Sequence, residues 1–281
     1  MEIFLFILNI LCWIVGTVLS LALILAILYI LIFVRPRGKE PQDKSLLCDY
    51  AHRGLHGNGV PENSLEAFEL ASAGGFGIEL DVQLSKDGEV MVFHDYTLIR
   101  MTGCDKKLCE LTAEELKELN LAGTEQKIPT LREVLSLVDG RVPILVELKG
   151  ENFDTSLCPK VAEILKDYSG RFCIESFNPL LVKEMRKLFP DRFCGLLYTN
   201  AVRDKKKASA LNVVITLMAL NFLCSPNFIS YNEKDRDSLP VKITTRLYRT
   251  PKFIWTVNNK ASLDRAHELG ECPIFEKIDR E

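Results

Sequence analysis

Two pairs of ionisable side chains share a spacing that brings charged groups together on a strand. Glu79 and Asp81 are separated by one residue within the otherwise apolar run Ile78–Val82, and Glu147 and Lys149 repeat this spacing. Because successive side chains of a strand point to opposite faces, both members of each pair face the same side. A solvated edge strand could carry the same acids, but the apolar residues on the alternate face argue against one.

Glu79, Asp81 and Glu147 together have the character of a cation site. Neighbouring carboxylates repel each other unless a positive charge lies between them. Oxygen ligands suit hard divalent ions, so these acids predict a site for Ca²⁺ or Mg²⁺ rather than zinc. Lys149 lies on the same face as Glu147 and is then placed to meet an anionic phosphate.

Two of the four histidines stand at the ends of predicted strands. His52 opens the tripeptide His52-Arg53-Gly54, and His94 directly precedes Asp95. By itself, a histidine beside an arginine at a strand end is more typical of a structural polar pair. With the acidic pairs nearby, two histidines at one rim predict shared acid and base catalysis near neutral pH.

The elements that must position these residues alternate along the chain after residue 45. Helices with hydroxyl-and-glutamate start signals, at Thr112 and Thr130, separate short apolar or β-branched runs. This alternation predicts parallel strands joined by helices. The predicted strands are Leu46–Ala51, Phe76–Leu84, Glu89–His94, Pro143–Lys149, Phe172–Phe177, Phe193–Thr199, Asn227–Tyr231, Phe253–Val257 and Cys272–Ile278.

One of the nine predicted strands has to lie outside an eight-stranded barrel. Asp87-Gly88 is typical of a two-residue hairpin turn, so Glu89–His94 should fold back against Phe76–Leu84. We therefore predict an α/β fold, a (β/α)8 TIM-type barrel with an extra β-hairpin at its C-terminal mouth, where such barrels place reactive groups. An open doubly wound sheet is disfavoured, because no glycine-rich phosphate motif follows the first strand.

The N-terminal residues have a different composition. No charged residue occurs from Ile3 to Val34, which exceeds the roughly 20 apolar residues that cross a bilayer. The alternatives are a buried core helix, a cleaved signal peptide and a tight helical hairpin. The length of the run, the absence of a basic leader and the lack of a polar turn near Gly16 favour a single span.

The flanking sequence predicts the domain organisation and the orientation. We expect a transmembrane anchor at 1–34, a linker at 35–45 and a barrel domain at 46–281. Arg35, Arg37 and Lys39 follow the apolar run, whereas Glu2 alone precedes it, so the positive-inside rule predicts a cell-membrane protein with a cytoplasmic catalytic domain. Nine cysteines without a CxxC pair agree with reduced thiols.

Two further features concern binding partners. The net charge of −3, without a basic stripe, gives no support for nucleic-acid binding, and nothing in the sequence identifies a protein partner. The apolar segment Leu211–Leu223 follows Lys205-Lys206-Lys207. We expect a barrel helix with a broad buried face, and the alternative is a surface helix that dips into the membrane.

The ordered motifs resemble the signature of the glycerophosphodiester phosphodiesterase family, over nearly all of the chain after the linker. The quoted segments are His52-Arg53-Gly54, Pro61-Glu62-Asn63-Ser64, Glu79-Leu80-Asp81-Val82, Ser85-Lys86-Asp87-Gly88, His94-Asp95, Glu147-Leu148-Lys149, Ser176-Phe177-Asn178 and Trp255-Thr256-Val257-Asn258. Each motif is weak alone, and the ordered set is specific. The chain departs from the family pattern after Cys272, so we expect a short or missing last helix, which leaves the closure of the barrel open.

The resemblance implies hydrolysis of a glycerophosphodiester to an alcohol and sn-glycerol 3-phosphate. The implied roles are acid–base catalysis by His52 and His94, phosphate binding by Arg53 and Lys149, cation binding by Glu79, Asp81 and Glu147, and supporting positions at Glu62, Asn63, Phe177 and Trp255. The implied route is attack by the glycerol 2-hydroxyl and opening of a cyclic phosphate by water. The alternatives are lysophospholipase D activity on membrane lysophospholipids and a non-catalytic membrane scaffold.

Overall fold

The computed structural model describes residues 1–36, 40–150 and 153–276. Within these residues, nine strands form one sheet. Their bounds are β1 Tyr50–Ala51, β2 Gly77–Leu84, β3 Val90–Val92, β4 Ile144–Leu148, β5 Phe172–Ser176, β6 Cys194–Tyr198, β7 Phe228–Asn232, β8 Lys252–Val257 and β9 Cys272–Phe275. Every predicted strand is present, although β1 is shorter than predicted.

Eight parallel strands close into the predicted barrel. β9 pairs in parallel with β8 and with β1, and β1 pairs with β2, so the closure that the divergent C-terminal sequence left open is complete. β3 pairs antiparallel to β2, which confirms the hairpin at Asp87-Gly88. The end of the last predicted strand, 277–278, lies outside the described residues.

The alternation of side chains along each strand separates two kinds of interior. Ile144, Val146 and Leu148 of β4 point outward and pack against the surrounding helices. The intervening Leu145 points inward and belongs to a cluster that fills the N-terminal end of the barrel, together with aromatic rings such as Phe228 and Phe253. The next inward-facing residue of β4 is Glu147, so from this level onward the barrel interior contains charged side chains instead of apolar ones.

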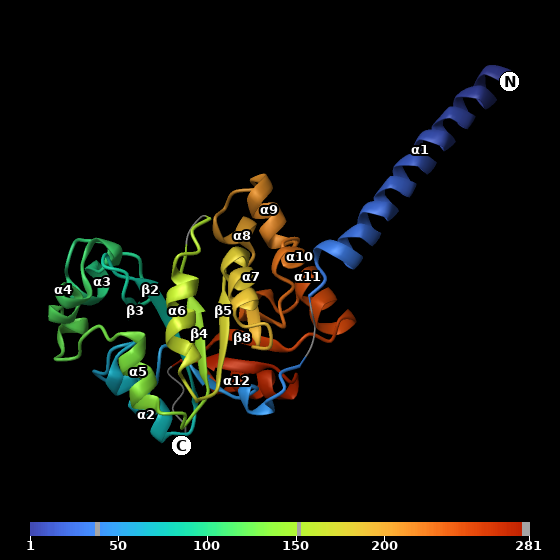
Figure 1. The fold of residues 1–281 in the computed structure, drawn as a ribbon. Coiled ribbons are helices and arrows are strands. Elements are labelled where there is room, and N and C mark those ends of the chain that lie inside the picture. Colours follow the sequence, from blue (N-terminus) through green and yellow to red (C-terminus); the bar gives the residue numbers. More distant parts are fainter. Residues whose placement is uncertain (37–39, 151–152, 277–281) are drawn as a thin grey trace.

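Helices surround the barrel as crossovers between the strands (Figure 1). Thr112 and Thr130 accept hydrogen bonds from the third helical residue, which confirms the two predicted capping boxes. The bounds are α2 Leu65–Ala73, α3 Ile99–Thr102, α4 Ala113–Glu118, α5 Leu131–Val138, α6 Leu157–Lys166, α7 Pro179–Leu188, α8 Ala201–Asp204, α9 Ala210–Thr216, α10 Asn221–Cys224, α11 Leu239–Lys242 and α12 Lys260–Glu268.

The hairpin is the base of a small lobe rather than an isolated pair of strands. α3 and α4 follow β3 and enclose a separate apolar cluster that includes Met91, Leu98, Leu108 and Leu116. Figure 1 shows this lobe in green beside the strand ends. The lobe holds the segment after β3 in a fixed position, and this segment carries His94.

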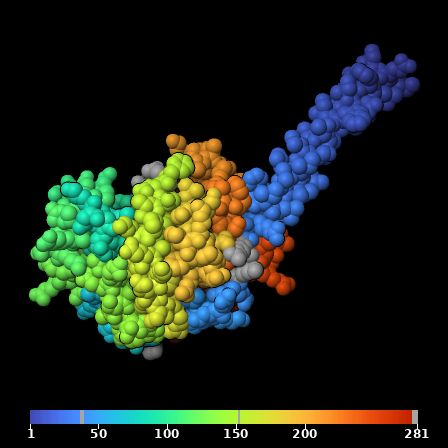
Figure 2. Space-filling model, in the orientation of Figure 1, coloured from blue at the N-terminus to red at the C-terminus, as the bar shows by residue number. Residues whose placement is uncertain are grey.

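The N-terminal apolar run is one long helix that projects from the barrel (Figures 1 and 2). α1, Glu2–Leu28, continues as a wider helical turn through Phe33, and none of its most apolar stretch is buried. The alternatives of a buried core helix and a helical hairpin are therefore wrong. Of the described helices, this one alone has the length and hydropathy to cross a membrane.

The prediction for Leu211–Leu223 was wrong in its geometry. The segment forms two short helices, α9 and α10, instead of one barrel helix. Asn212 is the buried residue of α9, whereas Leu211 is 62 % exposed. α10 packs against α7, and the last turn of the N-terminal helix contacts Leu217 and Phe222, but several apolar side chains of the segment stay exposed.

Candidate active site

The carboxyl ends of β2 and β4 bring the three predicted acids together. Asp81 stands opposite Glu147 in the parallel register, and Glu79 precedes Asp81 on the same face. One oxygen from each of these carboxylates lies within 4.8 Å of the other two. All three side chains are buried, so the repulsion between them is poorly screened.

Lys149 lies within this cluster. Its Nζ is 2.8 Å from Asp81 Oδ1 and 2.7 Å from Glu147 Oε1. Burial favours the neutral amine, but the two carboxylates outweigh it and raise the pKa of Lys149 above its ordinary value. Burial likewise acts to raise the pKa of Asp81, yet Lys149 and other nearby positive groups hold that pKa well below its usual range. Asp81 and Lys149 are therefore both charged.

The other two acids are less well compensated. Burial, followed by the charges of Asp81 and Glu147, raises the pKa of Glu79 well above its ordinary value. Burial also raises the pKa of Glu147 to about 7, against the opposing effect of Lys149. The cluster thus has less positive charge than its carboxylates need, which is the electrostatic situation that a bound divalent cation corrects.

The loop after β1 delivers His52 and Arg53 to this cluster. The backbone N–H of Arg53 donates to Glu79 Oε2 at 2.9 Å, and its guanidinium donates to Glu62 Oε1 at 2.8 Å. Arg53 adopts a left-handed φ of 56°, a costly conformation for a side chain of this kind. Gly54 follows with φ 81°, and a Cβ there would meet Ala67 at 2.8 Å, so glycine is required.

Glu62 and Asn63 belong to the start of α2, and both approach the acids. Glu62 accepts from Arg100 as well as Arg53, and these guanidinium groups keep its pKa lowered although burial opposes them. The amide of Asn63 donates to Asp81 Oδ2 at 2.9 Å. Its Oδ1 is buried without a hydrogen-bond partner among the described residues.

His94 reaches the same mouth from the loop after β3. Its Nδ1 lies 2.6 Å from Asp95 Oδ1, and Asp95 also pairs with Arg100. Gln83 fixes this segment by donating to the carbonyl oxygens of Phe93, His94 and Asp95. Burial lowers the pKa of His94, and Asp81 opposes that effect. The arrangement leaves Nε2 of a neutral imidazole available to the mouth.

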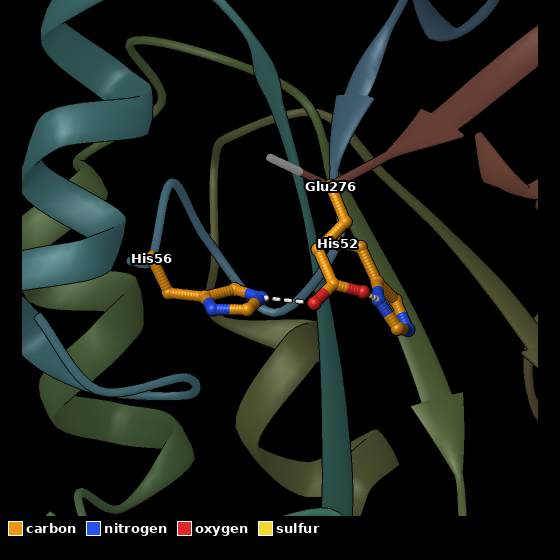
Figure 3. A group of neighbouring side chains, drawn as sticks. All are labelled: His52, His56 and Glu276. Carbon is orange, nitrogen blue, oxygen red and sulfur yellow. Dashed lines mark hydrogen bonds and ion pairs between the residues drawn. The ribbon is translucent and has the colours of Figure 1, made fainter. Parts of the chain in front are cut away.

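His52 belongs to a second polar group with His56 and Glu276 (Figure 3). Glu276 lies between the two imidazoles, with Oε2 3.3 Å from His52 Nδ1 and Oε1 3.5 Å from His56 Nε2. The other nitrogen of His52, Nε2, lies 4.0 Å from Glu79 Oε2. Glu276 is thus placed to hold the ring of His52 with its Nε2 toward the acids.

A pocket of about 460 Å³ opens beside the cluster between β4, β5 and the segment after β3. Its lining includes His94, Glu147, Lys149 and Phe177. The ring of Phe177 packs edge-on against Trp255 with centroids 5.6 Å apart. Of the two predicted aromatic residues, Phe177 is therefore part of the pocket lining, Trp255 contacts it without being part of that lining, and His94 and Lys149 contribute the polar side.

Sequence reasoning missed several residues of the mouth. Glu175 follows Glu147 in the register of β5, and it is almost fully buried with a pKa raised by burial and by Glu147. The alternation Ile174-Glu175-Ser176 could have identified it, as it identified Glu79. The alternation of β2 also puts Gln83 on the face of Glu79 and Asp81. No local signal marks Arg100 or Glu276, which lie in the site because of the lobe and the barrel closure.

The acid cluster fits a hard divalent cation. Three carboxylates converge within the distance that one ion can bridge, and the unpartnered Oδ1 of Asn63 adds a neutral oxygen nearby. Cysteine sulfur is absent from both groups of metal-ligating side chains found among the described residues. The donor set therefore agrees with Ca²⁺ or Mg²⁺ and disfavours a structural zinc site.

Comparison with known proteins identifies the family. Residues 52–276 match the model of the glycerophosphoryl diester phosphodiesterase family. A glycerophosphodiester phosphodiesterase of Caldanaerobacter subterraneus is 32 % identical over 232 residues, which cover 78 % of this chain and 89 % of the relative.

Solved structures agree with the sequence comparison. An Oleispira antarctica phosphodiesterase in complex with the product sn-glycerol-3-phosphate matches with a TM-score of 0.68 and 26 % identity, over 82 % of this chain and 92 % of that one. A Thermotoga maritima glycerophosphodiester phosphodiesterase matches with a TM-score of 0.63 and 28 % identity, over 82 % and 94 %. Given a family match that runs from His52, directly after β1, to Glu276, directly after β9, this chain is an enzyme of the glycerophosphoryl diester phosphodiesterase family.

Proposed function

We propose that the barrel hydrolyses a glycerophosphodiester to an alcohol and sn-glycerol 3-phosphate, with the help of a divalent cation. The supporting observation is the convergence of two histidines, one lysine and three buried carboxylates at one mouth. The Oleispira relative was crystallised with sn-glycerol-3-phosphate, the product expected of this reaction. Glu79, Asp81 and Glu147 would hold Ca²⁺ or Mg²⁺, which when bound supplies positive charge to the phosphate oxygens.

The protein's own groups would divide the remaining work. One of His52 and His94 takes the proton from the attacking hydroxyl, and the other donates a proton to the departing alcohol oxygen. Glu276 and Asp95 orient the two rings through their Nδ1 atoms. Arg53 and Lys149 hold phosphate oxygens and stabilise the negative charge that develops during the reaction.

Attack by the glycerol 2-hydroxyl, followed by water, accounts for both products without a nucleophile from a protein side chain. The hydroxyl loses its proton to a histidine and forms a bond to phosphorus, while the bond to the alcohol oxygen breaks. Water then opens the cyclic phosphate, and the two histidines exchange roles. The intramolecular first step gains from the fixed proximity of its reacting groups.

We further propose a division of the chain into an anchor, 1–34, a linker, 35–45, and the catalytic barrel domain, 46–281. α1 is long, apolar and unburied, which supports a single span of the cell membrane. A signal sequence is the alternative use of such a helix. Arg35, Arg37 and Lys39 support a cytoplasmic barrel by the positive-inside rule.

A second candidate substrate is a membrane lysophospholipid, cleaved at the same bond. Two observations favour it: the aromatic ring of Phe177 in the pocket lining, packed against Trp255, and the attachment of the barrel to an apolar helix. The glycerol of such a substrate retains an acyl chain, which needs an apolar environment. A non-catalytic scaffold is disfavoured, because every residue expected to take part in the chemistry is present at the mouth.

The test is release of glycerol 3-phosphate from glycerophosphocholine by the full-length protein in detergent, with Ca²⁺, with Mg²⁺ or with chelator. We expect cation-dependent release that both His52→Ala and Glu79→Ala abolish. His267→Ala is the matched control, because His267 also pairs with an aspartate but lies on α12 away from the mouth. Release that survives His52→Ala would contradict the proposed catalysis. Release of choline from lysophosphatidylcholine, without release of glycerol 3-phosphate from glycerophosphocholine, would assign the activity to the lipid substrate.

A further inference from the structure

A cluster of exposed apolar side chains lies on the barrel beside the end of α1. We call it the anchor-side surface, and its members come from α9, α10 and the turn after α11. The exposed fractions are 62 % for Leu211, 39 % for Val213, 40 % for Leu217, 43 % for Phe222 and 60 % for Leu247. Single exposed leucines are ordinary, but a group next to an apolar helix implies a common environment.

Direct contacts fix the anchor-side surface to the last turns of α1. The hydroxyl of Tyr29 donates to the Leu217 carbonyl at 2.8 Å, and the amide of Asn221 donates to the Val34 carbonyl at 2.7 Å. The rings of Phe33 and Phe222 pack edge-on at 5.5 Å. These contacts involve Tyr29, Phe33 and Val34, which span about one helical turn. They therefore fix where the anchor-side surface lies along the axis of α1.

A fourth contact places the turn after α11 at the same level. The hydroxyl of Tyr248 donates to the carbonyl of Ile30, and Leu247 is its neighbour in sequence. Figure 1 shows α10 and α11 next to each other at the base of α1, with α9 above them. The apolar residues of both segments therefore surround the point at which α1 leaves the barrel.

The bilayer is the occupant that this geometry favours. No charge interrupts the chain between Glu2 and Arg35, and Leu31 and Ile32 in the last turn remain about half exposed. A membrane that covers these side chains must extend to Val34. It then also reaches Leu217 and Phe222, which contact the same turn. A second copy of the chain would have to displace lipid from α1 to bind there.

Charged residues around the anchor-side surface suit lipid phosphates. Arg35, Lys205, Lys206, Lys207 and Arg246 are exposed at its margin. Asp204 is also exposed; Arg203 pairs with it at 2.7 Å and with the buried Asp235 at 2.6 Å. Basic side chains next to an apolar surface are typical of protein segments that lie in the headgroup layer of an anionic leaflet.

We propose that the anchor-side surface docks into the membrane leaflet in which α1 ends, and that this docking holds the barrel in one orientation. The inference rests on the proposed anchoring by α1. One end of the surface adjoins the rim of the mouth: β6 leads into α8 and α9, and the hydroxyl of Tyr198 in β6 donates to the Thr216 carbonyl at the end of α9. The other end, with α10 and the turn after α11, precedes the amino ends of β7 and β8. Docking therefore turns this side of the mouth toward lipid, and a lysophospholipid can move into the site without crossing water.

The experiment measures contact with lipid at single positions of the full-length chain. The four cysteines that are not buried, Cys12, Cys48, Cys104 and Cys109, are replaced by serine, and one new cysteine carries an environment-sensitive fluorophore. The new positions are Leu217→Cys and Leu247→Cys, with Leu21→Cys inside α1. Leu70→Cys is the matched control, because Leu70 is a half-exposed leucine on α2, far from α1 in Figure 1.

The labelled proteins are reconstituted into vesicles of phosphatidylcholine and phosphatidylglycerol that contain nitroxide lipid. We expect quenching at Leu21, Leu217 and Leu247 and none at Leu70. Quenching at Leu21 with Leu217 and Leu247 no different from Leu70 would overturn docking while anchoring stands. Energy transfer between differently labelled copies at Leu217, without quenching by nitroxide lipid, would identify a second copy as the occupant and also overturn it.

A second measurement links docking to catalysis. In the double variant Leu217→Ser with Leu247→Ser, we expect turnover of lysophosphatidylcholine in vesicles to fall by about tenfold, which corresponds to about 1.4 kcal/mol. Turnover of water-soluble glycerophosphocholine should be unchanged. Equal losses on both substrates would contradict an orienting role. Absence of turnover on both by the unmodified protein would refute the proposed function, whereas the quenching result would still decide docking.

Discussion

The mouth of the barrel buries charged groups, whereas the anchor-side surface exposes apolar groups. At the mouth, charged groups are buried: Asp81 is fully enclosed, and Lys149 lies within 3 Å of two carboxylates. At the anchor-side surface, leucine and phenylalanine side chains are exposed. Each arrangement is unfavourable in isolation, since buried charge lacks water and exposed apolar surface orders it. We propose that each becomes favourable with an additional component, a cation with phosphate in one case and lipid in the other.

This comparison predicts that changes in the two regions have different consequences. Changes at the mouth should reduce turnover of every substrate, because they act on the bonds that break. Changes at the anchor-side surface should act on access and orientation alone. The following predictions test this separation, in order of decreasing effect.

The largest effect is expected from removal of a histidine. His94→Ala should reduce turnover by about 10²–10⁴-fold, the range typical of general acid–base catalysis. The loss should be equal for soluble and lipid substrates and should leave the melting temperature nearly unchanged. Initial rates on both substrates, with calorimetry, provide the check. A loss confined to the lipid substrate would mean that the two regions are not separate in function.

Removal of the cation should affect stability as well as activity. A cation at 100 times its Kd stabilises the folded state by about 2.7 kcal/mol, and this gain should disappear with chelator. The pKa of Glu147, about 7, and that of Glu79 are raised, so both acids hold protons in the cation-free fold at a pH where they would ionise when unfolded.

The sign of the pH dependence follows from these raised values. The preference of the cation-free fold for the protonated acids is present at pH 4.5 and is lost as pH rises through 7. A cation needs the ionised forms, so its stabilising effect should grow over the same interval. Melting temperatures with and without Ca²⁺ or Mg²⁺ at pH 5.5 and pH 8, values chosen as roughly the two sides of that interval, provide the measurement. A shift that is larger at the lower pH would contradict these carboxylates as ligands.

Gly54→Ala should destabilise the protein and should also displace the loop that carries His52 and Arg53 to the mouth. The new Cβ would lie 2.8 Å from Ala67, and the residue has a left-handed φ. We expect a loss of about 1–3 kcal/mol in the free energy of unfolding, as for other overpacked positions. Denaturant titration measures it, with Gly59→Ala as the control, since Gly59 shares a positive φ but has open space around it. Equal effects at both positions would assign the cost to φ alone.

Two arginine–glutamate pairs allow a matched test of charge at the mouth. Arg100 joins Glu62 and Asp95 beside the mouth, whereas Arg141 pairs with Glu69 at the surface. Arg141→Ala should change stability by less than about 1 kcal/mol and leave the kinetics unaltered. Arg100→Ala should lower kcat/KM by about tenfold. Without Arg100, Asp95 is no longer held in place, and it therefore orients the ring of His94 less well. Identical kinetics for the two variants would remove Arg100 from the functional set.

The smallest effect is expected at the contact between α1 and the barrel. Tyr248→Phe removes one hydrogen bond, to the Ile30 carbonyl, and should cost about 0.5–1.5 kcal/mol without changing turnover of soluble substrate. Calorimetry and rates on glycerophosphocholine measure these two quantities. A large fall in soluble turnover would show that the position of α1 influences the chemistry directly.

The sequence was sufficient to predict the elements that depend on local pattern. Alternation along Gly77–Leu84 and Ile144–Leu148 predicted which side chains face the interior, because the period of a strand is independent of its neighbours. Capping boxes and the Asp-Gly turn predicted helix starts and the hairpin for the same reason. The order of the motifs identified the family, and with it the expected set from His52 to Trp255.

Tertiary structure decided what depends on neighbours distant in sequence. Closure of the barrel brings Glu276 to His52, more than 200 residues away, and the lobe brings Arg100 to Glu62. The environment of Leu211–Leu223 was also undetermined by its composition, since an apolar segment packs equally well against protein or lipid. In the structure it contacts the end of α1 through Tyr29 and Asn221 while several of its apolar side chains stay exposed, and such long-range contacts leave no periodic trace in either segment.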